Sequence, residues 1–283
     1  MRRIAGWRYA RLVAIAVIVA IGVNSIVWAI ADWHLADMHV YQDAALRIRA
    51  GEPLYGGDVD SLSAYRYAPW FAYAWVPLTY LPQGMIDFGW SVFLVTGSAL
   101  AIWASLRGGG HSRVLLALVM APILFGISAI GNVQGPMLAL LMIGLPRRWA
   151  GLAVGVAASL KLAPLILALI FLAQRRWWQF LTAVATTTVL WLPAVWMAID
   201  PVTFDSGLAR TLPQPLWLAV AAVGLISATA LAWKRSRHVT LAAALAAVLA
   251  IPRLFVYDIS LLLVGTLDPT KVTGTPVREE RSG

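Results

Sequence analysis

WAGLAVGVAASLKLAPLILALIFLAQ, residues 149 to 174, is the stretch that decides the fold, because it is apolar throughout yet carries one charged residue, Lys161. It lies between Arg147-Arg148 and Arg175-Arg176, and the positive-inside rule places both pairs on the cytoplasmic side. About 25 residues cannot make two complete crossings at about 1.5 Å per residue. The stretch is therefore either one crossing or a re-entrant hairpin. We predict the hairpin, with Lys161 and Pro164 near its apex.

Composition extends this picture to the whole chain. Of its 283 residues, 60% are hydrophobic and 12% are charged, whereas soluble domains average about 25% charged residues. A spanning helix takes roughly 20 apolar residues. We predict an all-α fold, a polytopic transmembrane helical bundle of about 8–10 membrane segments that include short or re-entrant helices. Residues 1–267 form one transmembrane domain, and the polar tail 268–283 is expected to be disordered.

The individual spans follow from hydropathy. The first span lacks a small-residue cleavage site, so we interpret it as a retained signal anchor. The stretch 68–81 is short and broken by Pro69 and Pro77, which favours a kinked or partial crossing. Clear spans are predicted at 10–31, 86–106, 114–130, 180–198 and 216–233, and shorter apolar pieces at 137–145, 239–251 and 258–267.

The charge pattern indicates topology. The net charge of +9 comes from basic residues dispersed in pairs between apolar spans, which does not favour nucleic acid as a partner. Four arginines within residues 2–11 precede the first span, so we expect a cytoplasmic N-terminus and a multi-pass protein of the plasma membrane. The loop 32–66 then lies outside. The chain has no Cys, which excludes disulfides and thiolate metal sites.

The external loop is predicted to hold a short interfacial helix over 37–50. Its expected end has basic residues in the last turn, Gly51 just beyond it and then Pro53. Asp37 at its start has two interpretations, a helix N-cap or a general base toward a hydroxyl. The second is favoured by the polar neighbours within a dozen residues: Asp32, His34, His39, Tyr41 and Asp43. One carboxylate and one imidazole around a methionine do not predict a metal site.

Several further polar residues interrupt apolar surroundings. Lys161 either extends to an interface or binds an anion such as a lipid phosphate, with Arg66 or Arg253 as further cations. Asn132 and Gln134 either form a turn or bind sugar hydroxyls at a cavity. Asp258 either pairs with Arg253 or contacts substrate. Two aromatic residues beside the external loop are candidates for stacking on a sugar: Trp70 and Trp75.

Several motifs, in order, resemble glycosyltransferase family 87. They are DMHVYQDAALRIRAGEPLY at 37–55, YRYAP at 65–69, GNVQ at 131–134, AGLAVGVAASLKLAP at 150–164 and PRLFVYD at 252–258. The YRYAP motif is also similar to mannosyltransferases of glycosylphosphatidylinositol assembly. The resemblance covers about residues 33 to 263 and implies a GT-C-like fold and a polyprenyl-phosphate sugar donor. Members are usually longer, with further helices after the last motif.

The resemblance also implies residue roles. Asp37 matches the acidic residue of the family's first external loop and would be the catalytic base. Lys161 matches the lysine of its K-x-x-P element and would bind the donor phosphate with Arg66 and Arg253. Asn132 and Gln134 stand where the family shows G-Q-x-N, with the two amides exchanged. The candidates for acceptor or sugar binding are His39, Tyr41, Tyr67, Asn132, Gln134 and Asp258.

We therefore expect an inverting hexosyltransferase that moves a sugar, mannose in the best-known branch, to a lipid-linked or glycan acceptor on the outer face. Neither G-x-G-x-x-G nor a P-loop occurs, and no cofactor is expected. Two rival functions remain at this stage. One is a transporter or flippase of lipid-linked saccharides, which the lack of internal repeats disfavours. The other is an inactive truncated relative.

Overall fold

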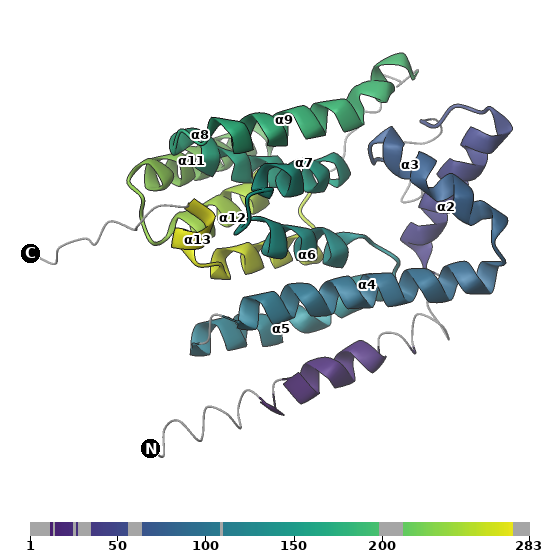
Figure 1. Cartoon of the computed structure of the whole chain (residues 1–283), viewed down its shortest axis with the longest axis horizontal. Coiled ribbons are helices and arrows are strands. Elements are labelled where there is room, and N and C mark those ends of the chain that lie inside the picture. The colour runs from purple at the N-terminus through teal and green to yellow at the C-terminus, as the bar shows by residue number, and fades with distance from the viewer. Residues whose placement is uncertain are drawn as a thin grey trace, which may run out of the picture.

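The computed structural model describes residues 12–13, 15–24, 27, 35–55, 64–107, 110–197 and 212–273. Every regular element within these ranges is a helix (Figure 1). The predicted all-α class is therefore confirmed. Of the first span, the structure describes the helical residues Ile15–Asn24, and the remainder of that prediction lies outside the described residues.

Among the described residues, four helices are long and apolar enough to cross a membrane. Each begins two or three residues before its predicted start, because Gln83, His111, Trp177 and Gln214 are taken into the first turn. Their bounds are α4 Gln83–Leu106, α5 His111–Ala129, α9 Trp177–Trp191 with its 3-10 continuation η3 Leu192–Trp196, and α11 Gln214–Trp233.

A second group of helices is about half as long. Each has 11 residues: α6 Gln134–Gly144, α7 Ala150–Leu160, α12 Val239–Leu249 and the 3-10 helix η4 Val256–Thr266. An α-helix of that length measures about 16 Å, roughly half the apolar thickness of a bilayer. An α-helix of this length that starts or ends at a membrane surface therefore has its other end inside the bundle, as α6 and α7 do on either side of Arg147-Arg148.

The stretch between the arginine pairs is a hairpin, as predicted. After α7, Lys161 has extended backbone, and the chain continues as η2 Ala163–Leu167 and α8 Ala168–Ala173. A Cβ on Gly151 would meet Gln179, and one on Gly155 would meet Thr186, so α7 and α9 run in the same direction. The chain between them must run back the other way. Lys161 therefore lies at the apex, where the backbone leaves the helix.

The external loop forms a small unit beside the bundle. The helix predicted over 37–50 is confirmed as α2 Ala36–Ala50, and Gly51 follows it with the left-handed φ of 72°. The stretch 68–81 forms α3 Pro69–Trp75 and the 3-10 helix η1 Val76–Tyr80, in which Pro77 occupies the first turn. The chain is kinked there, as the prolines predicted.

Two apolar cores result. The larger joins the half-length helices to α4, α5 and α11. The smaller contains Tyr41 of α2 together with Phe71 and Trp75 of α3, and it also includes Ala129 at the end of α5 and Val133 from the loop between α5 and α6. Leu160, at the end of α7, packs against both cores. The seam between the cores thus lies beside Lys161.

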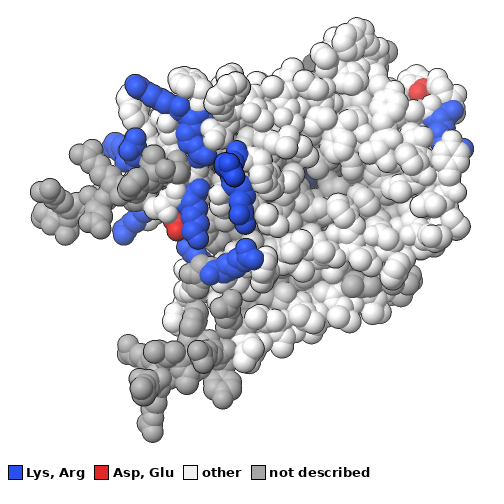
Figure 2. Space-filling model, in the orientation of Figure 1, with Lys and Arg blue, Asp and Glu red and all other residues white. Residues whose placement is uncertain are grey.

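Lys and Arg side chains gather at one end of the molecule, where α13 (Pro269–Thr273) lies and where α11 turns into α12 (Figure 2). The helix α13 occupies the first part of the stretch predicted as a tail, and residues 274–283 lie outside the described residues. Asp32 and His34 also lie outside them. Lys161 and the polar side chains around it lie away from the basic end, toward α2 and α3.

Candidate functional site

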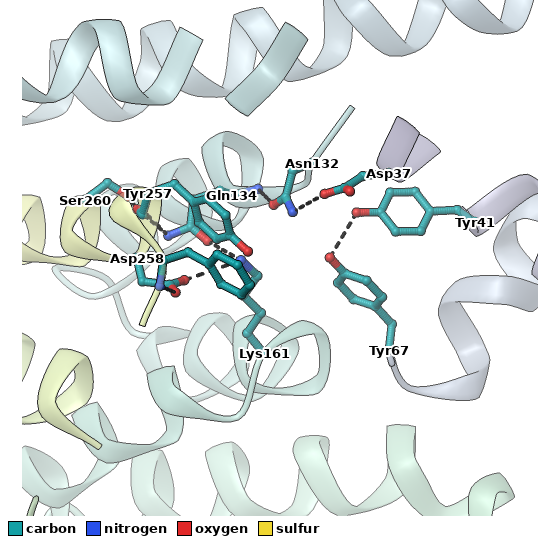
Figure 3. Close-up of polar contacts among 10 residues, drawn as sticks. Asp37, Tyr41, Tyr67, Asn132, Gln134, Lys161, Tyr257, Asp258 and Ser260 are labelled. Carbon is teal, nitrogen blue, oxygen red and sulfur yellow. Dashed lines mark hydrogen bonds and ion pairs between the residues drawn. The ribbon is translucent and has the colours of Figure 1, made fainter. Parts of the chain in front are cut away.

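Asp37 is held by a contact across the chain rather than by its own helix. Leu35 occupies the N-cap position of α2, and no side-chain capping bond is made there. Instead the Asp37 carboxylate accepts a hydrogen bond from Asn132 Nδ2 at 2.5 Å (Figure 3). The N-cap interpretation of Asp37 is therefore wrong, because its side chain is turned to the loop between α5 and α6.

The loop between α5 and α6 contacts the first turn of α2. The backbone N–H of Asp37 donates to the carbonyl oxygen of Ile130 at 2.9 Å. Gly131 has a φ of +97°, and a Cβ there would lie 2.8 Å from the backbone nitrogen of Met38. Trp90 Nε1 donates to the Gly131 carbonyl at 2.9 Å. Only glycine combines this conformation with so close an approach.

The two amides of the GNVQ motif continue the network inward. Asn132 Oδ1 accepts the backbone N–H of Gln134 at 3.0 Å, which fixes the direction of the Asn132 amide. Gln134 Nε2 donates to Ser260 Oγ at 3.1 Å, and Gln134 Oε1 accepts from Lys161 Nζ at 2.8 Å. Asn132 is 2% exposed and Gln134 is fully buried. The turn alone does not explain them, because both side chains link helices.

Lys161 is surrounded by three partners. Besides Gln134, its ammonium lies 3.6 Å from Asp258 Oδ1 and 4.2 Å from the centre of the Tyr257 ring. Asp258 Oδ2 also accepts the backbone N–H of Phe255 at 3.0 Å. The pairing considered for Asp258 with Arg253 is not the one formed, since Arg253 lies over the Phe255 ring at 5.0 Å.

Tyrosines line the α2 side of the cluster. The hydroxyl of Tyr41 donates to that of Tyr67 at 2.9 Å, and Tyr55 donates to the Tyr67 carbonyl at 2.8 Å. Trp75 is buried against Tyr41 and Trp90, so it belongs to the small core rather than to an open stacking surface. Trp70 donates through Nε1 to Ser159 Oγ at 3.0 Å.

The remaining candidates lie at or beyond the margin. His39 is on the exposed face of α2, two residues from Asp37, and Figure 3 does not include it. Arg66 is exposed, but its charge acts on Asp37. Tyr55 and Ser260 were missed from the sequence. Ser260 follows Tyr257-Asp258 closely enough to have been noticed. Among the described residues, no three His, Asp or Glu side chains gather.

Burial sets the acidity of Asp37. Its removal from water raises the pKa of the carboxyl above its usual value. The hydrogen bond from Asn132 and the positive charges of Lys161 and Arg66 act in the opposite direction. Burial outweighs them. A carboxylate with a raised pKa accepts a proton more readily, which suits a general base.

The fold and this cluster define an integral membrane protein built around a buried carboxylate and a lysine. The model of glycosyltransferase family 87 matches residues 65–215, more than half of the chain. The chain belongs to glycosyltransferase family 87. The matched region contains Arg66, Tyr67, Asn132, Gln134 and Lys161, whereas Asp37, Arg253 and Asp258 lie outside it.

Two curated relatives are similar over about 59% of the chain. Each is named a polyprenol-phosphate-mannose-dependent alpha-(1-2)-phosphatidylinositol pentamannoside mannosyltransferase. The relative from Mycobacterium tuberculosis (strain CDC 1551 / Oshkosh) is 31% identical over 184 residues, and that from Mycolicibacterium smegmatis (strain ATCC 700084 / mc(2)155) is 26% identical over 185. The matches span 42% and 44% of these relatives, less than half of their length. No solved structure matches the chain.

Proposed function

We propose that this protein transfers a hexose, mannose by analogy with the two relatives, from a polyprenyl-phosphate donor to a lipid-linked or glycan acceptor. The observation that carries the proposal is the joining of Asp37 to Lys161 through Asn132 and Gln134 in one buried polar cluster. The cluster supplies both groups that such a transfer needs. One accepts a proton and the other stabilises the charge of a leaving phosphate.

The proposed reaction is a direct displacement. The oxygen of the acceptor hydroxyl attacks the anomeric carbon as Asp37 takes its proton, and the bond from that carbon to the phosphate oxygen breaks. The electron pair of that bond leaves with the polyprenyl phosphate, whose charge Lys161 stabilises together with Arg66 and Arg253. Attack from the face opposite the leaving phosphate inverts the configuration of the sugar.

The approach of the donor is supported by the ion pair at the apex. The Lys161 ammonium lies 3.6 Å from Asp258 Oδ1. An incoming phosphate competes with Asp258 for the ammonium of Lys161. The positive charge of Lys161 therefore has an anionic partner both before and after the phosphate binds. His39, Tyr41, Tyr67 and Asp258 are the residues we assign to the acceptor side of the site.

The proposed location of the site is the outer face of the plasma membrane. The support is the end of the molecule where most of the Lys and Arg side chains in view gather, which the positive-inside rule assigns to the cytoplasm (Figure 2). The cluster lies away from that end, beside α2 and α3. A cytoplasmic N-terminus and a multi-pass topology follow from the same orientation.

The test compares sugar transfer by two variants of the same helix. Membranes that contain the wild type, Asp37→Asn or Asp43→Asn receive labelled polyprenyl-phosphate mannose and a phosphatidylinositol mannoside acceptor. We expect Asp37→Asn to lose about 100-fold or more in rate, as for removal of a general base. Asp43→Asn is the matched control, because Asp43 is an exposed carboxylate on the same helix, and its rate should equal that of the wild type.

Two results would contradict the proposal. If Asp37→Asn transfers sugar at the wild-type rate, Asp37 is not the base. If the wild type transfers neither mannose nor another sugar but exchanges the labelled lipid across the bilayer, the protein is a transporter of lipid-linked saccharides. Analysis of the product by NMR tests the stereochemistry, since retention of configuration excludes direct displacement.

A further inference from the structure

The amides of Asn132 and Gln134 are committed to partners inside the protein. Asn132 accepts through Oδ1 from the Gln134 backbone and donates through Nδ2 to Asp37. Gln134 accepts through Oε1 from Lys161 and donates through Nε2 to Ser260 and to the Tyr257 carbonyl. Both side chains are buried. A sugar could reach either amide only if the packing around it opened, because Asn132 is 2% exposed and Gln134 is fully buried, and the hydrogen bonds that both amides already make stabilise that packing.

We propose that Asn132 and Gln134 are positioning residues that set the Asp37 carboxylate and the Lys161 ammonium relative to each other, rather than ligands of the sugar. The inference rests on the proposed function, because it assigns roles toward the base and the phosphate partner of that reaction. It replaces the sugar-binding role that the sequence suggested for both amides.

The backbone supports this assignment. The loop that carries Asn132 also accepts the N–H of Asp37 through Ile130, so the base is fixed to the loop by main chain and side chain. Gln134 begins α6 two residues later and reaches Lys161 at the apex of the hairpin. The segment from Ile130 to Gln134 therefore holds both Asp37 and Lys161. A misplacement of about 1 Å in such a pair can cost about 100-fold in rate.

Asn132 leaves one carboxylate oxygen available. Its Nδ2 donates to Asp37 Oδ2, and Oδ1 is left for the acceptor hydroxyl. The titratable and charged groups that act on Asp37 or are acted on by it come from α2, the segment before α3, the hairpin apex and the start of η4; they are Tyr41, Arg66, Tyr67, Lys161 and Tyr257. None of these is changed by substitution of Asn132, so the titration of Asp37 reports on the hydrogen bond.

The first experiment titrates Asp37 directly in purified protein. A hydrophobic carbodiimide labels protonated carboxyls, and mass spectrometry follows labelling of Asp37 against pH in the wild type, Asn132→Ala and Asn132→Asp. Because the hydrogen bond favours the ionised form, its loss should move the midpoint upward by about one pH unit. Asn132→Asp keeps the size of the side chain and should move it upward as well, since it places a second carboxyl beside the first.

The same variants are assayed for transfer. We expect Asn132→Ala to lower kcat about 10- to 100-fold, with the acid limb of the pH profile shifted upward and the KM for the acceptor unchanged. Thr187→Ala is the matched control for loss of a buried polar side chain, because Thr187 bonds only to helix carbonyls of α7 and α9. An unmoved labelling midpoint in Asn132→Ala, or a raised acceptor KM without a pH shift, overturns the role of Asn132.

Gln134 is tested through the donor. Gln134→Glu places a carboxylate beside Lys161 that competes with the phosphate, so the KM for the donor should rise more than in Gln134→Ala. The KM for the acceptor should stay constant in both. The reverse pattern, a raised acceptor KM with an unchanged donor KM, makes Gln134 a sugar ligand and overturns the inference.

Failure of the positioning role can be distinguished from failure of the proposed sugar transfer. If the wild type transfers sugar and Asp37→Asn does not, while the Asn132 variants titrate like the wild type, only the positioning role fails. If the wild type transfers no sugar, the reaction fails and the inference with it, even where the labelling midpoint shifts. The labelling experiment then still reports whether Asn132 holds the Asp37 carboxylate.

Discussion

Lys161 shows how a charged side chain is tolerated deep in an apolar bundle. Insertion of a lysine at the centre of a membrane helix costs about 2.5–3.5 kcal/mol. Here Gln134 accepts one hydrogen bond, Asp258 supplies a counter-charge and the Tyr257 ring covers the ammonium. Gln134 begins α6, whereas Tyr257 and Asp258 both belong to η4, so the charge ties these two helices to the apex of the hairpin.

The ion pair gives a test at the level of single residues. Lys161→Met alone leaves the Asp258 carboxylate buried without a counter-charge, which should lower stability by about 3–5 kcal/mol. The double variant Lys161→Met/Asp258→Asn removes both charges and keeps an acceptor for the Phe255 N–H, so most of the stability should return. Thermal unfolding in detergent measures both.

Transfer assays on the same proteins separate stability from function. The double variant should stay inactive although it is stable, because no ammonium remains for the phosphate. Sugar transfer by the stable double variant would show that the reaction does not require Lys161. Equal instability of the single and double variants would mean that packing around Lys161, rather than its charge, holds the apex.

The identity of these residues was largely predictable, but their partners were not. Lys161 and Asp37 stand out because charged groups beside apolar runs are costly. The partner of Asp37 is 95 residues away, and the pairing of Lys161 with Asp258 joins the apex of the hairpin to the start of η4. Local patterns offered a helix cap as one of two interpretations of Asp37 and favoured Arg253 as the partner of Asp258, but the structure forms neither of these contacts.

At the level of elements, α2 depends on two glycines in different ways. Gly51 ends the helix in a left-handed conformation with open space around it, whereas Gly131 has a positive φ and also contacts the start of the helix. The end of α2 was predicted from Gly51 and its neighbours, because that signal is local. The contact of α2 with Gly131 could not be predicted, because it joins two segments that are distant in the sequence.

The two glycines form a matched pair of substitutions. Gly51→Ala should cost about 1 kcal/mol, the strain of a left-handed alanine. Gly131→Ala carries the same strain and also forces its Cβ to within 2.8 Å of the Met38 backbone nitrogen, so α2 must shift. We expect a larger loss of thermal stability and at least a 10-fold loss of transfer, since Asp37 moves with the helix.

Thermal unfolding and transfer assays on both variants check this prediction. Equal effects of the two alanines would show that the close contact between Gly131 and Met38 is not needed to place the base. An active Gly131→Ala protein with a normal melting temperature would show that the loop between α5 and α6 does not position α2.

For the whole molecule, the absence of cysteine makes topology directly measurable. Single cysteines introduced at two exposed positions, Glu52→Cys near the end of α2 and Lys234→Cys at the basic end, provide clean labelling sites. On intact cells a membrane-impermeant maleimide should label the first at once. It should label the second only after the membrane is permeabilised. The opposite result would reverse the proposed orientation and place the site on the cytoplasmic side.

The half-length helices have a consequence for how a lipid substrate is handled. Lys161 follows the last residue of an 11-residue helix that starts near the basic end, so its backbone lies about 16 Å along the helix axis from that end. Drawing a lipid out of a bilayer costs about 0.8 kcal/mol for each CH₂ that enters water. If the protein uses a polyprenyl-phosphate donor as proposed, a phosphate site inside the bundle leaves the polyprenyl tail among its neighbouring lipids. The donor then reaches the site by diffusion in the plane of the membrane, without its tail entering water.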